Sequence, residues 1–148
     1  MTRSTEASGS TAWAVRLRWS TCRPTRRNSI RFQSLLKIHQ AVVGECPDWW
    51  GGVNCLDLPP REVFQHLAAE VAGVWVDHAE IDEQGAQQGR AEAIQAARSE
   101  SGWPGLYFGG VAFKYQRPVE ELEQAARLAA RYMDVVTTGN WTRCACRR

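Results

Sequence analysis

The feature that most constrains the fold is an alternation of short apolar runs with longer helix-forming segments between Trp49 and Thr138. Short apolar runs are typical of strands that are buried on both faces, and the segments between them have helical spacing or a helix-forming composition. We predict strands at residues 49–56, 73–76, 105–113 and 133–137, and helices at residues 60–71, 83–101 and 118–132. Each pair of strands is separated by a length that fits a right-handed crossover, so the sequence predicts the α/β class with a parallel sheet.

The length of the chain limits how much of a larger fold this pattern can form. A complete (β/α) barrel needs roughly 250 residues, and the chain has 148. We therefore exclude a complete barrel and predict a domain of parallel βαβ units over residues 29–138. Its first element is an amphipathic helix over residues 29–43, on which the lone His39 is expected to be a surface or boundary residue.

The amino-terminal segment differs in composition from the rest of the chain. Between Met1 and Arg31 the only acidic residue is Glu6, whereas seven arginines are present, and no period of two or 3.6 residues is sustained. We predict a disordered Arg/Ser/Thr-rich tail over residues 1–28. An organelle transit peptide and a nucleic-acid-binding arm are alternative interpretations of this composition.

Charge and cysteine content favour a cytoplasmic protein. The formal net charge of +2 is too small to indicate a nucleic-acid or membrane partner for the whole molecule, and no apolar run approaches the roughly 20 residues that span a bilayer. Five cysteines at irregular spacing do not suggest a secreted disulfide framework. Cys144 and Cys146 are too few and too closely spaced for a zinc site, so we expect neither a metal nor a cofactor.

Three stretches resemble the BtpA/SgcQ family of (β/α) barrels, which is related to phosphoribosylanthranilate isomerase and other phosphate-binding barrels. They are Gly52-Val53-Asn54-Cys55-Leu56, Val74-Trp75-Val76-Asp77 with the later Gly89-Arg90-Ala91-Glu92, and Val111-Ala112-Phe113-Lys114. The family favours Val-Asn-Val-Leu, Arg-Val-Asn and Val-Lys-His at these places, so the chain departs from it beside Asp77 and Lys114. The resemblance covers about residues 49–138, the middle of such a barrel. It implies that residues 29–138 form part of an incomplete TIM-type barrel.

The resemblance implies that intact relatives bind or convert a phosphorylated small molecule, as sugar-phosphate isomerases or transferases do. The family name also implies a second hypothesis, a non-enzymatic role in the assembly of photosystem I. A third hypothesis, a basic-tailed nucleic-acid-binding protein, depends on the arginine-rich start alone.

Polar residues gather where the predicted strands end. In a barrel the active face lies at the carboxyl ends of the strands, so these residues are expected to converge. The candidate catalytic residues are Asp77, His78 and Lys114, and the candidate substrate-binding residues are Asn54, Asp57 and Thr138. Structural roles compete with these functions, because Asp57 can cap a helix, Asp77 can belong to a turn and His78 can be a hydrogen-bonded loop residue.

The carboxyl end does not fit the phosphate loop that such a barrel requires. After Thr138 a Gly-rich loop is expected, whereas residues 139–148 read Gly-Asn-Trp-Thr-Arg-Cys-Ala-Cys-Arg-Arg. Reading the codons one base later permits Gly-Thr-Gly-x-Ala-Ala, so we interpret the ending as a frameshift near Gly139, with a genuine short protein as the alternative interpretation. An incomplete barrel predicts self-association through exposed sheet edges and little catalytic activity of this chain.

Overall fold

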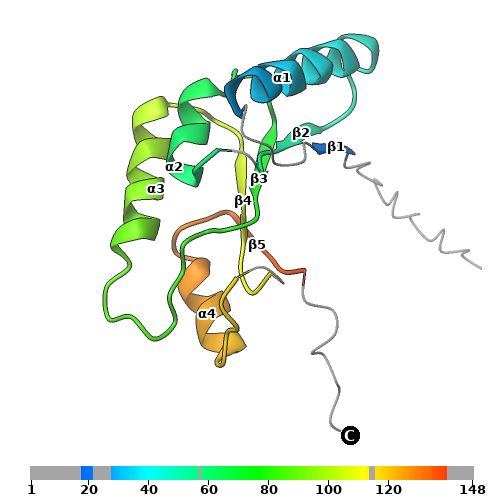
Figure 1. Ribbon diagram of the computed structural model, residues 1–148. Helices are drawn as coiled ribbons and strands as arrows, with labels where there is room; N and C mark the ends of the chain where they lie inside the picture. The colour runs from blue at the N-terminus through cyan, green and yellow to red at the C-terminus, as the bar shows by residue number, and fades with distance from the viewer. Residues whose placement is uncertain (1–17, 22–27, 57, 114–115, 140–148) are drawn as a thin grey trace, which may run out of the picture.

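The computed structural model describes residues 18–21, 28–56, 58–113 and 116–139, which form one parallel sheet with helices packed against it (Figure 1). The strands follow one another across the sheet in chain order, and every neighbouring pair is parallel. They are β1 (Arg18–Thr21), β2 (Gly51–Asn54), β3 (Gly73–Val76), β4 (Leu106–Gly110) and β5 (Val135–Thr137). The predicted α/β class and parallel sheet are confirmed.

Helices occupy the connections between the strands. They are α1 (Asn28–Glu45), α2 (Pro60–Val63), which continues into the 3-10 turn η1 (Phe64–His66), α3 (Gly89–Ser101) and α4 (Leu122–Ala129). Right-handed crossovers between strands that neighbour one another in chain order place every helix on the same face of a sheet. Figure 1 shows α2, α3 and α4 on one side of the strands.

The main core lies between the sheet and these helices. Alternation along β3 directs Val74 and Val76 into this core, where both are buried. The ring of Phe64 from η1 packs edge-on against Tyr107 of β4, with 5.3 Å between the ring centroids. The indole N–H of Trp103 donates a hydrogen bond of 3.0 Å to the carbonyl of Val71 and so satisfies a buried polar group.

The opposite face of the sheet carries aromatic side chains. Trp75 and Phe108 alternate with the core residues of β3 and β4 and are paired across the two strands. Trp75 packs edge-on against Phe113, and Phe108 packs edge-on against Trp50. The strands are therefore apolar on both faces, as the sequence predicts for a buried parallel sheet.

The prediction of a structureless tail over residues 1–28 is wrong at Arg18–Thr21. These residues form β1, in register with Gly51–Asn54 of β2. A strand at this position is stabilised by backbone hydrogen bonds to a neighbour that is distant in sequence, so local periodicity gives no sign of it. Residues 1–17 and 22–27 lie outside the described residues.

His39 is buried, and the prediction of a surface or boundary position is wrong. The residue is only 3% exposed, and its Nε2 lies 3.1 Å from the carbonyl oxygen of Gly51. A Cβ atom at Gly51 would lie 3.0 Å from the same Nε2. The face of α1 that carries His39 therefore packs closely on the start of β2, where a side chain at Gly51 would require the His39 ring to shift.

Three helices are shorter than predicted, and in two of them the missing residues adopt an extended or looped backbone. The segment expected to be helical over residues 60–71 becomes extended at Leu67. Beyond it, the carbonyl of Val71 accepts the hydrogen bond from the Trp103 indole. The helix expected from residue 83 begins at Gly89. Before it, the Gln88 side chain donates to the carbonyls of Asp82 and Gly85, which closes a loop instead of a helical turn.

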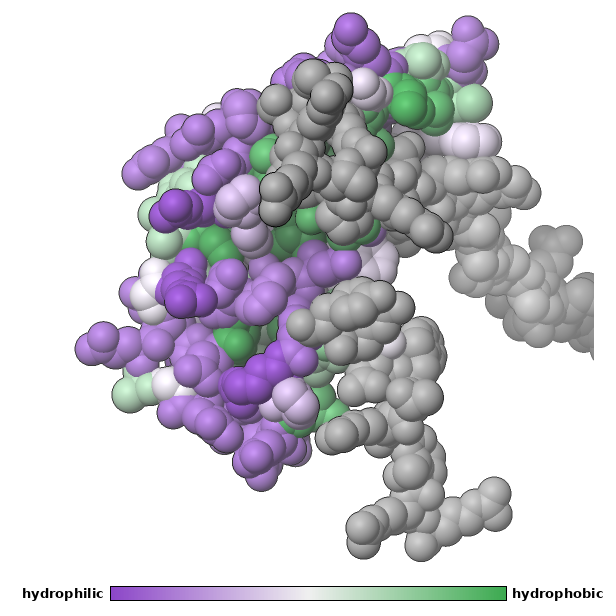
Figure 2. All heavy atoms as spheres, viewed as in Figure 1, coloured by the Kyte–Doolittle hydropathy of each residue, from purple (hydrophilic) through white to green (hydrophobic). Residues whose placement is uncertain are grey.

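The other boundaries move by a few residues, as helix and strand ends commonly do. The helix predicted over residues 118–132 is confined to Leu122–Ala129, and the last two strands occupy Leu106–Gly110 and Val135–Thr137. In the view of Figure 2 hydrophilic side chains cover most of the surface around α3 and α4. Among the described residues, no helix has the length and apolar character needed to cross a bilayer.

Candidate functional site

The carboxyl ends of the strands bring several predicted site residues to one edge of the sheet. Asn54 is the last residue of β2, and Asp77 directly follows β3. The exposed Thr138 follows β5 at the same edge. Asp57 and Lys114 lie outside the described residues, so their predicted roles stay predictions.

Asn54 and Asp77 both have polar groups in low-dielectric surroundings. The side-chain Oδ1 of Asn54 is buried and accepts no hydrogen bond from any described residue. Burial raises the pKa of the Asp77 carboxyl above its ordinary value. Buried polar groups in these states are costly for stability and are enriched at functional sites.

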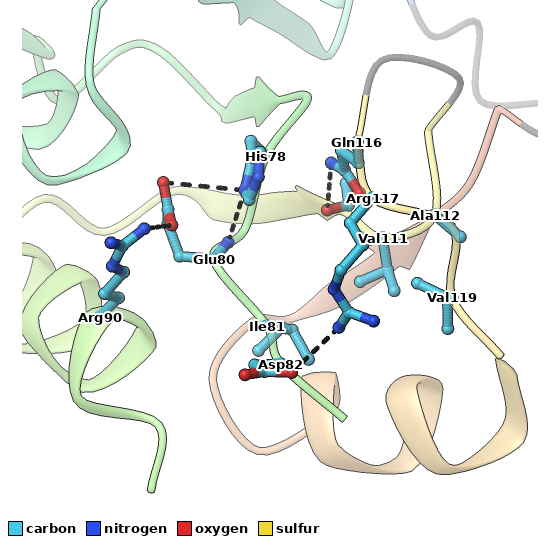
Figure 3. A pocket seen from close by; sticks show the side chains of 11 residues that line it. His78, Glu80, Ile81, Asp82, Arg90, Val111, Ala112, Gln116, Arg117 and Val119 are labelled. Atoms are coloured by element: carbon cyan, nitrogen blue, oxygen red, sulfur yellow. Dashed lines mark hydrogen bonds and ion pairs between the residues drawn. The ribbon is translucent and has the colours of Figure 1, made fainter. Parts of the chain in front are cut away.

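A cavity of about 420 Å³ opens beside this edge, between the loop that follows β3 and the loop that follows β4 (Figure 3). The loop after β3 and the start of α3 contribute His78, Glu80, Asp82 and Arg90, while the loop after β4 contributes Gln116 and Arg117. Its volume falls within the range of small-molecule sites, and its polar groups come from two chain segments that meet only in the folded protein.

The apolar part of the cavity wall comes from the same two loops. Ile81 lies on the first loop, and Val111, Ala112 and Val119 lie on the second (Figure 3). Apolar side chains beside a few polar groups are typical of sites that bind small organic molecules.

Two residues in the wall of the cavity have left-handed backbone conformations although neither is glycine. They are Glu80, with a φ of 56°, and Ala112, with a φ of 58°. Left-handed backbone costs an ordinary residue roughly 1–2 kcal/mol, and such residues gather at ligand sites because the surrounding structure enforces them. The backbone bond from Ala79 N–H to Gly110 O, of 3.0 Å, joins the two loops between these positions.

Gln116 connects the two strands at the base of the cavity, a role that the sequence did not reveal. Its Nε2 donates to the carbonyls of Asp77 and Gly110, and its Oε1 accepts a hydrogen bond of 3.2 Å from the N–H of Phe113. All of these partners are backbone groups. The side chain therefore fixes the loop after β4 against the carboxyl end of β3.

His78 and Glu80 form a hydrogen-bonded pair on the loop after β3 (Figure 3). The Nδ1 of His78 accepts a hydrogen bond of 3.1 Å from the backbone N–H of Glu80, which selects the neutral ring with its proton on Nε2. The Glu80 carboxylate lies 3.1 Å from the Nη1 of Arg90. The Nε2–H of the half-exposed His78 ring is thus a hydrogen-bond donor at the edge of the cavity.

Glu83 and Arg117 join the two loops below the cavity. Glu83 is buried, and the guanidinium of Arg117 donates to both of its carboxylate oxygens at 3.0 and 2.7 Å. These hydrogen bonds lower the pKa of the Glu83 carboxyl below its ordinary value. Arg117 also contacts Asp82 at 2.9 Å, so its charge is compensated by the loop after β3.

Within the described ranges no three His, Cys, Asp or Glu side chains come together in a geometry that would hold a metal ion. Cys144 and Cys146 lie outside those ranges. The donors that line the cavity suit hydrogen bonding and ion pairing with an organic ligand.

Comparisons of the chain with models of protein families, with curated proteins and with solved structures found no match.

Proposed function

We propose that residues 29–138 are part of a phosphate-binding (β/α) barrel of BtpA type, and that the cavity between the loops after β3 and β4 binds a phosphorylated small molecule. The consecutive order of parallel strands supports the barrel, because helices on one face leave the other face free to line a barrel interior. Trp75, Phe108 and Phe113 would then be interior side chains.

The observation that carries the proposal is the position of the cavity, together with the strained backbone of two residues in its wall. It lies at the carboxyl ends of adjacent parallel strands, where (β/α) barrels have their active sites, and Glu80 and Ala112 in its wall have left-handed backbone. Arg90 supplies a charged donor to a phosphate, and the Nε2–H of His78 supplies a neutral donor to the rest of the ligand.

The same edge supplies groups for proton transfer, as isomerisation of a sugar phosphate requires. Burial raises the pKa of Asp77 and makes its carboxylate a stronger base than an exposed aspartate. His78 at the next position is a neutral donor. We assign His78, which lines the cavity, the role of hydrogen-bond donor to the ligand. Asp77 and Asn54 lie at the same strand ends but do not line the cavity, so their roles as general base and as substrate-binding residue stay predictions.

Calorimetric titration with ribose 5-phosphate and with ribose tests the proposal. We expect saturable binding of ribose 5-phosphate and an affinity for ribose at least tenfold weaker. Arg90→Gln should weaken binding of ribose 5-phosphate about tenfold, since a charge-assisted hydrogen bond contributes roughly 1.5 kcal/mol or more. Arg127→Gln is the matched control, because Arg127 forms a similar exposed pair with Glu123 on α4 and does not line this cavity. Equal affinities of the two variants would contradict the proposed site.

A further inference from the structure

A second cavity, of about 340 Å³, lies next to the first and shares two residues with it. It is formed by the Pro59-Pro60-Arg61 segment at the start of α2 and by the first turns of α3, including Ala93 and Ile94. The shared residues are Glu80 and Arg90. Their ion pair, at 3.1 Å, therefore separates the two cavities.

The two cavities differ in charge. The wall of the first contains two carboxylates, from Glu80 and Asp82, and two guanidinium groups, from Arg90 and Arg117. The wall of the second contains the guanidinium groups of Arg61 and Arg90 and only one carboxylate, that of Glu80. An anionic group is therefore favoured in the second cavity, whereas the first is balanced in charge.

Both arginines of the second cavity have donors that a ligand could use. Within the described part of the chain, Arg61 forms no ion pair, and Arg90 is bonded to Glu80 through Nη1. The Arg90 side chain is 83% exposed. A guanidinium has five N–H donors in a planar arrangement, so Arg90 can bind a phosphate through the remaining ones while Glu80 keeps its own bond.

Glu80 lies at the boundary between the two cavities and has a strained, left-handed backbone with a φ of 56°. Its carboxylate contacts Arg90, and the residue lines both cavities. A carboxylate at this position orients Arg90 but also repels an incoming anion. Removing the Glu80 carboxylate should therefore strengthen the binding of a phosphate if the cavity is an anion site. If the carboxylate served only to hold Arg90 in place, its removal would not strengthen binding.

We propose that the two cavities form one extended site, with a phosphomonoester bound between Arg61 and Arg90 in the second cavity and the hydroxyl-bearing body of the ligand in the first. The inference rests on the proposed function and adds the direction in which the ligand lies. The body contacts His78 and the apolar wall near Ala112, and the ligand crosses the boundary beside Glu80.

The test compares the full chain with Arg61→Gln, Glu80→Gln and Arg127→Gln, titrated with ribose 5-phosphate and with inorganic phosphate. We expect Arg61→Gln to weaken binding of both probes roughly threefold, as suits an exposed charge. Glu80→Gln should strengthen both by a similar factor. Arg127→Gln should leave both unchanged, and circular dichroism should show the same folded content in all four proteins.

Amide chemical shifts of the full chain give an independent measurement. Inorganic phosphate should shift the amides of Arg61 and Ala93, whereas ribose 5-phosphate should shift these and also the amide of Ala112. Binding of ribose 5-phosphate that Arg61→Gln leaves unchanged would overturn the extended site and leave the first cavity as the proposed site. Absence of saturable binding by the unaltered chain would overturn both proposals.

Discussion

The buried carboxylate of Glu83 accepts two hydrogen bonds from the guanidinium of Arg117, a residue 34 positions later in the chain. Glu83 belongs to the loop after β3, and Arg117 belongs to the loop after β4. The Glu83 side chain is only 1% exposed, whereas that of Arg117 is about half exposed. The pair therefore fixes the relative position of the two loops that enclose the candidate site.

The Glu83–Arg117 pair predicts a loss of stability in acid. The hydrogen bonds from Arg117 lower the folded-state pKa of Glu83 below its value in the unfolded chain. Their stabilisation is complete above the unfolded pKa of about 4.3 and is lost as the pH falls from there through the folded pKa. Urea unfolding of Glu83→Gln between pH 7 and pH 3 should show a weaker pH dependence than the unaltered chain, and lower stability at pH 7.

Glu123→Gln provides the control for this measurement, because Glu123 forms an exposed pair with Arg127. Its stability should follow the pH in the same way as that of the unaltered chain. The interpretation fails if Glu83→Gln and the unaltered chain lose stability in parallel over the whole pH range.

Asp77→Asn should have the opposite effect on stability. Burial raises the folded-state pKa of Asp77, so the ionised carboxylate destabilises the folded chain above that pKa and has no effect below the unfolded pKa. The variant should therefore unfold at a higher temperature than the unaltered chain at pH 7 and at the same temperature near pH 3. On the predicted role of Asp77 as general base, the variant should also lose isomerase activity, as expected when a destabilising group serves function. A lower unfolding temperature at pH 7 would show that the carboxylate stabilises the fold.

Gly102→Ala should destabilise the chain by about 1 kcal/mol through backbone strain alone. Gly102 ends α3 with a φ of 65°, and a Cβ atom there would meet no other atom within 4 Å. Gly89→Ala is the control, because Gly89 also faces open space and has no left-handed backbone. Chemical denaturation measures both variants, and equal stabilities would contradict the strain at Gly102.

The class of fold could be predicted from local pattern alone. Short apolar runs that carry Val53, Val74 and Tyr107 alternate with helical segments, and these side chains are buried in the core that the pattern predicts. The predicted end of α3 at residue 101 is confirmed: the helix ends at Ser101, and the next residue, Gly102, adopts the left-handed conformation at little cost. The sequence also identified Asn54 and Asp77 as residues at strand ends, since the position of a residue in a parallel unit follows from local pattern.

Contacts between side chains and strands that are distant in sequence depend on how the elements pack. The strand β1, the buried His39, the Gln116 side chain at the base of the cavity and the Glu83–Arg117 pair all depend on partners far away in the chain. The late start of α3 has the same origin, because the loop before it contains the buried Glu83. Hydrophobic periodicity indicates which face of an element is buried. Hydrogen bonds and ion pairs between loops depend instead on distances that are fixed only when the sheet is packed.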